Sequence, residues 1–147
     1  MAKSQNKIKK TKVGSNTGSG VRATAPDDES LKFSFRFFDP SDKEVCPETF
    51  KEGYTQTLMQ RLRDLSRFTV KEFRTTNHKS VRGHKIDWGK TARPDGFTTL
   101  NEQFQMCEPW QFQLTANEHG RVHGVFVGGC FYVIWLDHHH AVYPKRK

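Results

Sequence analysis

The stretch Arg121-Val-His-Gly-Val-Phe-Val-Gly-Gly-Cys-Phe-Tyr-Val-Ile-Trp-Leu136 decides the fold. Its first half predicts a strand over residues 121–127, and Gly128-Gly129 predicts a two-residue hairpin turn because both glycines can take positive φ. The run from Cys130 to Leu136 is apolar on both faces, which is typical of a central strand covered on both sides. The stretch therefore predicts an antiparallel hairpin inside a sheet.

Two further segments have the alternating pattern of a half-buried strand. In residues 110–114, apolar side chains alternate with Gln111 and Gln113. Residues 31–38 read LKFSFRFF, with apolar side chains at the odd positions and polar ones between them up to Arg36. Successive side chains of a strand point to opposite faces, so we expect each segment to bury one face.

Two helices are expected between these strands. Apolar residues recur at spacings of four and three from Phe50 to Leu65, which is one face of an amphipathic helix. Pro47 suits a first helical position just before this run. Thr69 and Glu72 form a capping box, which predicts a second helix over residues 70–76.

The segment between the second helix and the C-terminal strands has no clear periodicity. Residues 77–99 are expected to form a long irregular loop, of a length that is uncommon unless it is functional, and residues 100–105 a helical turn. The predicted fold class is α+β, with two helices packed on one face of a small, mostly antiparallel sheet.

The N-terminal segment is expected to lie outside this fold. Residues 1–29 are rich in Lys, Ser, Gly and Thr with almost no large apolar side chain, so we expect a disordered tail. It is either a basic arm that contacts RNA or a solvated leader, and it lacks the apolar core of a secretory signal. Residues 30–147 then form one domain, and no apolar run is long enough to predict a membrane span.

The charge favours a nucleic acid as partner. The chain has 24 Lys and Arg against 16 Asp and Glu, a formal net charge of +8 and a pI near 9.6. Nine of the basic residues lie at the two ends of the chain, so its middle carries little net charge. The three cysteines, Cys46, Cys107 and Cys130, have no metal-ligand spacing and are odd in number, which predicts reduced thiols in the cytoplasm.

The order of elements and the end of the chain resemble the RelE/ParE toxin superfamily. Arg121 opens the penultimate strand, an apolar hairpin follows, and His140-Ala-Val-Tyr143 ends the chain as in that family. The resemblance implies a toxin that cleaves messenger RNA, often on the ribosome, and that a cognate antitoxin holds inactive. The superfamily also contains inhibitors of DNA gyrase that cut nothing. The basic tail and the 77–99 loop are additions to its usual compact form.

The candidate catalytic residues follow from what RNA cleavage without a metal or cofactor requires. A base must activate the 2′-hydroxyl, a cation must stabilise the phosphate, and an acid must protonate the leaving oxygen. His140 and Tyr143 are the first candidates because they match the family's ending, and Arg121 can hold two phosphate oxygens. His123 is a second candidate base on the face of Arg121, or else a core histidine.

A set of basic side chains after the first helix is the predicted RNA-backbone patch. It comprises Lys71, Arg74, Lys79, Arg82, His84 and Lys85. Trp88 could stack a base, although we favour its packing on the core. No metal site is expected, because adjacent side chains of His138-His139-His140 point to opposite faces of an extended segment.

The predicted function is a metal-independent endoribonuclease toxin that leaves a 2′,3′-cyclic phosphate. Two alternatives stay open on the sequence. One is a non-enzymatic, ParE-like inhibitor of DNA gyrase, and the other is a basic module that binds RNA or the ribosome.

Overall fold

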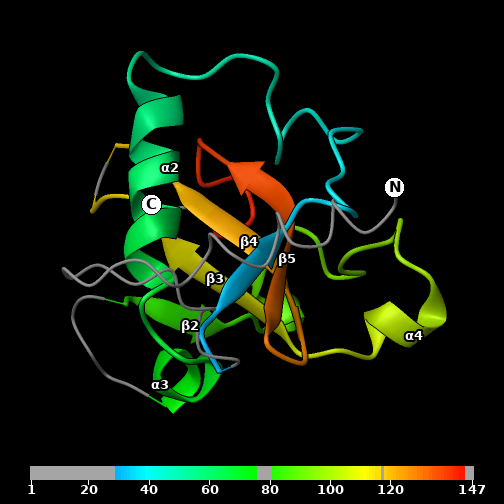
Figure 1. The fold of residues 1–147 in the computed structure, drawn as a ribbon. Coiled ribbons are helices and arrows are strands. Elements are labelled where there is room, and N and C mark those ends of the chain that lie inside the picture. The colour runs from blue at the N-terminus through cyan, green and yellow to red at the C-terminus, as the bar shows by residue number, and fades with distance from the viewer. Residues whose placement is uncertain (1–28, 76–80, 117, 145–147) are drawn as a thin grey trace, which may run out of the picture.

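The computed structural model describes residues 29–75, 81–116 and 118–144 (Figure 1). The predicted tail, apart from Glu29, and Lys79 of the predicted patch lie outside these residues. The elements in chain order are β1 (Lys32–Ser34), α2 (Tyr54–Leu65), α3 (Val70–Thr75), β2 (Gly83–Lys85), the 3-10 turn η1 (Trp88–Lys90), α4 (Glu102–Gln105), β3 (Pro109–Gln113), β4 (Arg121–Val127) and β5 (Cys130–Asp137).

The strands form one mixed sheet in the order β1-β5-β4-β3-β2. The predicted hairpin is confirmed: β4 and β5 are antiparallel with Val127 opposite Cys130, and Gly128 has φ of +61° in the turn. β1 runs parallel to β5, while β3 is antiparallel to β2 and β4. The α+β class is therefore confirmed, and β5 lies inside the sheet as its apolar sequence predicts.

β1 is shorter than the alternating segment 31–38 predicts. It ends at Ser34, and the Phe38 N–H donates to the Phe35 carbonyl in a turn. Beyond the turn, Phe37 packs on Tyr132 at 5.4 Å between ring centroids, and the Asp39 N–H donates to the Ile134 carbonyl at 2.9 Å. The chain thus returns to β5 after the turn, where Phe37 is packed on the sheet.

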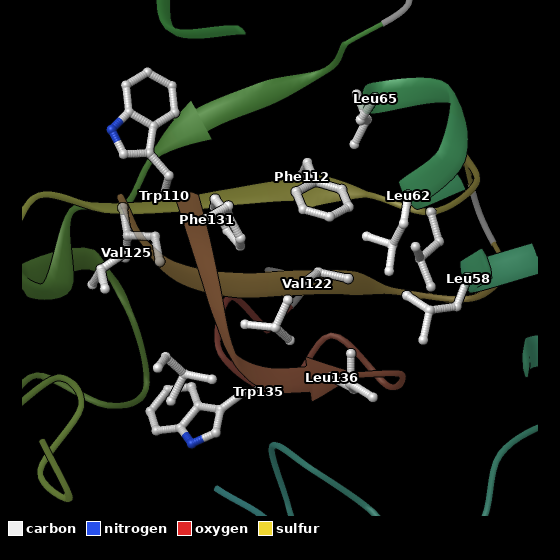
Figure 2. Close-up of a cluster of buried hydrophobic side chains, with 14 of the residues drawn as sticks. Leu58, Leu62, Leu65, Trp110, Phe112, Val122, Val125, Phe131, Trp135 and Leu136 are labelled. Carbon is white, nitrogen blue, oxygen red and sulfur yellow. The ribbon is translucent and has the colours of Figure 1, made fainter. Parts of the chain in front are cut away.

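Helices α2 and α3 cover one face of the sheet. Leu58, Leu62 and Leu65 of α2 are buried, and Figure 2 shows them turned toward the side chains of the central strands. α2 begins at Tyr54, later than predicted, because its N-cap Gly53 has φ of +84° and the preceding segment is not helical. Phe50 stacks on Tyr54 from outside the helix.

The predicted capping box of α3 is confirmed. The Glu72 N–H donates to Thr69 Oγ1 and the Thr69 N–H donates to Glu72 Oε1, both at 3.0 Å. The short helix places Phe73, which is fully buried, against Trp110 and Phe112 of β3. α3 is therefore held by both its cap and its packing on the sheet.

The opposite face of the sheet is covered by the segment between β2 and β3. Trp88 and Phe97 pack on Trp135, and Phe104 of α4 packs on Tyr132. The preference for Trp88 on the core is therefore confirmed. The predicted loop 77–99 is wrong in part, because residues 83–85 pair with β3 and residues 88–90 form a 3-10 turn. In the part of the chain described, no helix is long and apolar enough to cross a membrane.

Candidate active site

Polar side chains line the face of β3 and β4 that is turned away from α2 and α3. Gln113 pairs with Arg121, Arg121 pairs with Asp137 of β5, and Gln111 pairs with His123. Paired residues share a face, as do residues two apart on a strand, so these side chains leave the sheet on the same side. Phe73 of α3 packs on Trp110 and Phe112, the residues of β3 that alternate with the two glutamines. The helices therefore cover the opposite face of the sheet from these polar side chains.

Arg121 is half-buried and keeps most of its hydrogen-bonding capacity. Its Nη1 donates to Gln111 Oε1 at 3.0 Å, while its buried Nε has no hydrogen-bond partner. No carboxylate among the residues described forms an ion pair with it. Burial lowers the pKa of Arg121, and the nearby Asp137 and Tyr143 act in the opposite direction. A guanidinium stays charged in proteins, so Arg121 can accept an anion.

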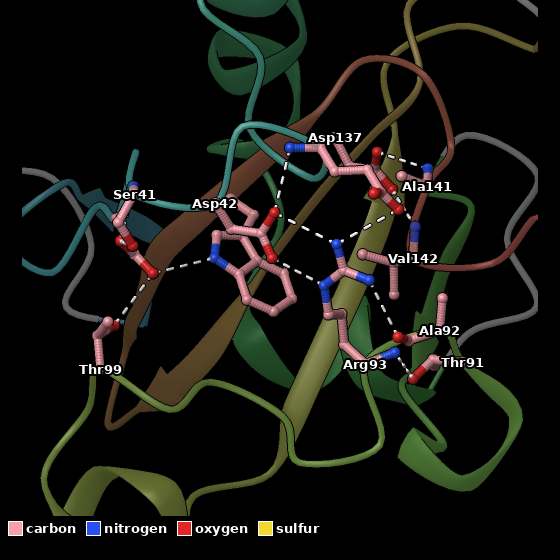
Figure 3. A network of polar contacts seen from close by, with 12 residues as sticks. Ser41, Asp42, Thr91, Ala92, Arg93, Thr99, Asp137, Ala141 and Val142 are labelled. Carbon is pink, nitrogen blue, oxygen red and sulfur yellow. Dashed lines mark hydrogen bonds and ion pairs between the residues drawn. The ribbon is translucent and has the colours of Figure 1, made fainter.

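Asp137 holds the turn that leads from β5 to the end of the chain. Its carboxylate, 1% exposed, accepts the N–H groups of Ala141 at 2.7 Å and Val142 at 2.9 Å (Figure 3). Burial alone raises the pKa of Asp137, but His123 and the two N–H groups outweigh it, so this pKa lies below its ordinary value. His140 has a left-handed φ of +61° within the turn.

Tyr143 follows this turn and lies next to Asp87, just after the end of β2. The Asp87 N–H donates to Tyr143 Oη at 2.9 Å, and Tyr143 Oη donates to the Asp87 carbonyl at 3.4 Å. Tyr143 is half-buried and lies close enough to Arg121 to raise its pKa slightly against the effect of burial. His140, also half-buried, lies in the same segment three residues earlier. The structure therefore brings Arg121 and Tyr143 together.

His123 lies inside the protein, 0% exposed, with its Nε2 at 3.4 Å from Asp137 Oδ2. Burial lowers the pKa of His123, and Asp137 opposes this shift. A substrate on the surface cannot reach this ring. The interpretation as a core histidine therefore fits its position, and its role as a base does not.

The predicted RNA patch is divided between the two faces of the sheet. Lys85 is opposite Trp110 on the helix-covered face, where Lys85 Nζ at 3.2 Å and Arg74 Nη2 at 2.8 Å both bind Glu108. Lys71 is exposed on α3 near Arg74. These cations lie beside the helices and not beside Arg121.

Two other members of the patch, Arg82 and His84, lie near the glutamines on the face of Arg121. His84 is opposite Gln111, and Arg82 Nη1 lies 3.5 Å from Gln113 Oε1. The alternation of side chains along β2 causes the division, because His84 and Lys85 are adjacent and must face opposite ways. Sequence reasoning treated the basic residues as one patch because it could not tell which were on a strand.

Two residues of the site were missed in the sequence. Asp137 directly follows an apolar strand and precedes a turn, a position where aspartate often binds backbone N–H groups. Gln111 is only 3% exposed although it alternates with apolar residues as a solvent-facing side chain does. The first could have been found from its position, but nothing in the sequence distinguishes Gln111 from Gln113.

The histidines around the 138–140 run form a separate cluster beside the start of α2. The Lys51 N–H donates to His138 Nε2 at 3.1 Å, and burial lowers the pKa of His138. His119 lies 6.0 Å from His138 between ring centroids. Within the residues described, no group of three or more His, Cys, Asp or Glu is placed to hold a metal ion.

A second polar network on this face ties two loops together (Figure 3). Arg93 forms a two-pronged pair with Asp42, at 2.7 and 3.2 Å, and the hydrogen bond from Arg93 keeps the pKa of Asp42 below its ordinary value. Asp39 accepts hydrogen bonds from Thr99 and from the Trp135 indole. These groups satisfy one another, so the network fixes the loops that cover the sheet.

No family model matches the chain, and comparison with curated proteins and with solved structures finds no similar one. The resemblance to the RelE/ParE superfamily therefore rests on the order of elements and on the residues around Arg121 and Tyr143.

Proposed function

We propose that the protein is a metal-independent endoribonuclease of the toxin type, which cleaves RNA at the Arg121–Tyr143 site and leaves a 2′,3′-cyclic phosphate. The observation that carries the proposal is the half-buried Arg121, whose Nε has no hydrogen-bond partner and which has no carboxylate partner in the residues described. A cation left in this state by the protein is suited to an anionic ligand. The resemblance adds messenger RNA, the ribosome and an antitoxin as proposed partners.

Arg121 would stabilise the charge that develops on the phosphate. Its Nη1 is already fixed by Gln111, so little reorganisation is needed when the nucleotide binds. The 2′-oxygen attacks phosphorus, the charge on the non-bridging oxygens increases, and the fork of the guanidinium can hold two of these oxygens. Loss of one such preorganised donor typically lowers kcat by about 10²–10³-fold.

Tyr143 would protonate the 5′-oxygen as it leaves. Its oxygen accepts a hydrogen bond of 2.9 Å from the Asp87 N–H but donates only a long one, 3.4 Å, to the Asp87 carbonyl. A substrate oxygen can replace that weak acceptor without disturbing the stronger bond. His140, in the same segment, is the second proposed proton donor or acceptor.

The test is cleavage of a mixed RNA in EDTA by the full-length protein, with and without translating ribosomes, followed by end-group analysis. We expect cyclic phosphate ends, and a loss of at least about 100-fold in Arg121→Gln. The matched control is Arg63→Gln, an exposed arginine on α2 that pairs only with its neighbour Asp64 in the residues described.

Tyr143→Phe has its own control in Tyr132→Phe, a tyrosine packed on Phe37. RNA that stays intact with the wild-type protein under both conditions would overturn the proposal. A supercoiling assay would then test gyrase inhibition. RNA binding lost on deletion of residues 1–28, without any cleavage by the intact chain, would favour the binding module.

A further inference from the structure

We propose that His84 is the base that takes the proton from the 2′-hydroxyl, an inference that rests on the proposed function. His84 is exposed on β2, the edge strand of the sheet. The sequence places it among the residues that only hold the RNA backbone. The register of the sheet places it on the same face as Arg121, in the row of paired residues next to that of Arg121.

The Gln111 side chain links His84 to Arg121 across three strands. His84 is directly opposite Gln111, and Gln111 Oε1 is the acceptor that holds Arg121 Nη1 at 3.0 Å. Side chains of directly paired residues begin about 5 Å apart at Cβ and share a face. A phosphodiester bound to Arg121 would therefore lie on the face from which the His84 side chain projects, with Gln111 between the two side chains.

The same short segment also positions the proposed acid. Asp87, which binds Tyr143 Oη, follows His84 by three residues, or about 10 Å of extended chain. A base and an acid on the two sides of a phosphate are what an in-line displacement requires, because the nucleophile and the leaving group lie opposite each other. A short stretch of backbone, from His84 in β2 to Asp87 just after it, thus relates the two groups.

The backbone of β2 packs closely against the core. A Cβ at Gly83 would lie 2.7 Å from Phe73 Cε1, so only glycine fits beside this fully buried ring. The close approach fixes the position of β2, and with it the direction of the His84 side chain on the other face. A catalytic group on a fixed strand keeps its geometry better than one on a loop.

Three of the other imidazoles in the residues described are less suited. His123 is fully buried and His138 is occupied as an acceptor for the Lys51 N–H. His119 is 7% exposed and lies beside His138, in the cluster next to α2. His84 has no hydrogen-bond or ion-pair partner in the described part of the chain, so its ring nitrogens are available to substrate.

The proton balance is complete without a metal. A ring nitrogen of His84 takes the 2′-hydroxyl proton while the 2′-oxygen forms its bond to phosphorus. The bond from phosphorus to the 5′-oxygen breaks, and that oxygen takes the phenolic proton of Tyr143. Both side chains then return to their starting states by exchanging protons with water, to which His84 is exposed.

The experiment compares the pH dependence of kcat/KM for the full-length wild type, His84→Gln and His139→Gln. His139 is an exposed histidine of the other cluster, so it is the matched control. A general base contributes about 10²–10⁴-fold, so we expect His84→Gln to lose at least about 100-fold near neutral pH and to lose the acid limb of the profile. Binding of an uncleavable RNA with 2′-deoxyribose at the cut site should stay within about two-fold, because the base acts on a proton and not on the phosphate charge.

Chemical rescue separates a catalytic loss from a structural one. Imidazole added to His84→Ala should restore part of the cleavage, and it should not stimulate Arg121→Gln. Full activity and an unchanged pH profile in His84→Gln, with Arg121→Gln inactive, would overturn this inference and leave the proposed nuclease standing. If the wild type cleaves no RNA, both the proposed nuclease function and the role of His84 are overturned. Loss of activity in His84→Ala that imidazole does not restore, with normal thermal unfolding, would make His84 a binding residue and also overturn the inference.

Discussion

Asp137→Ala is expected to destabilise the protein and to release the segment that carries Tyr143. The carboxylate of Asp137 is 1% exposed and accepts two short hydrogen bonds, from Ala141 and Val142. Hydrogen bonds to a charged group contribute about 1.5–3 kcal/mol each, and buried N–H groups without an acceptor are costly. We therefore expect a loss of about 4 kcal/mol in the free energy of unfolding, a large part of the stability of a domain of this size.

Asp137→Asn should reduce the free energy of unfolding by less than Asp137→Ala does. The amide keeps one carbonyl acceptor but loses the charge, so the expected loss is about 2 kcal/mol. Asp95→Asn is the control, because Asp95 is exposed and should change stability by less than about 0.5 kcal/mol. Urea unfolding followed by tryptophan fluorescence measures all three variants.

The loss should depend on pH in a defined direction. The pKa of Asp137 is lowered in the folded protein, so its stabilisation is present above the unfolded pKa of about 3.9 and is lost as the pH falls through the folded value. The difference between wild type and Asp137→Asn should be constant from about pH 5 to 7 and shrink below about pH 4. A loss under about 1 kcal/mol in Asp137→Ala between about pH 5 and 7 would refute the reasoning.

Two further predictions concern stability. Gly124→Ala should prevent stable folding, because its Cβ would meet the Tyr132 carbonyl oxygen. Gly89→Ala should change the midpoint of thermal unfolding little, because its Cβ would lie 3.5 Å from Asp87 Oδ1, an ordinary contact distance. The wild type should lose stability as the pH falls below about 6.5, since the pKa of His138 is lowered in the folded state and protonation ends its acceptance of the Lys51 N–H. His138→Gln should reduce this dependence in urea unfolding between about pH 5 and 7, and an unchanged slope would contradict the assignment.

Local signals in the sequence determined a large part of the fold. The glycine pair and the apolar runs around it specify the β4–β5 hairpin, and the Thr69–Glu72 pair specifies the start of α3. The four-and-three spacing specifies the buried side of α2. Each of these features depends on residues within a few positions of one another, so the pattern carries the information by itself.

The candidate site is different, because its members come from distant parts of the chain. The sequence pointed to Arg121, His140 and Tyr143, but only the tertiary structure decided that Arg121 and Tyr143 are neighbours and that His123 is buried beneath the surface. The pairing of β2 with β3 decided that His84 lies on the same face of the sheet as Arg121 and that Lys85 lies on the opposite face. A strand's alternation determines which side chains share a face, whereas the packing of the loops and helices determines which of them a substrate can reach.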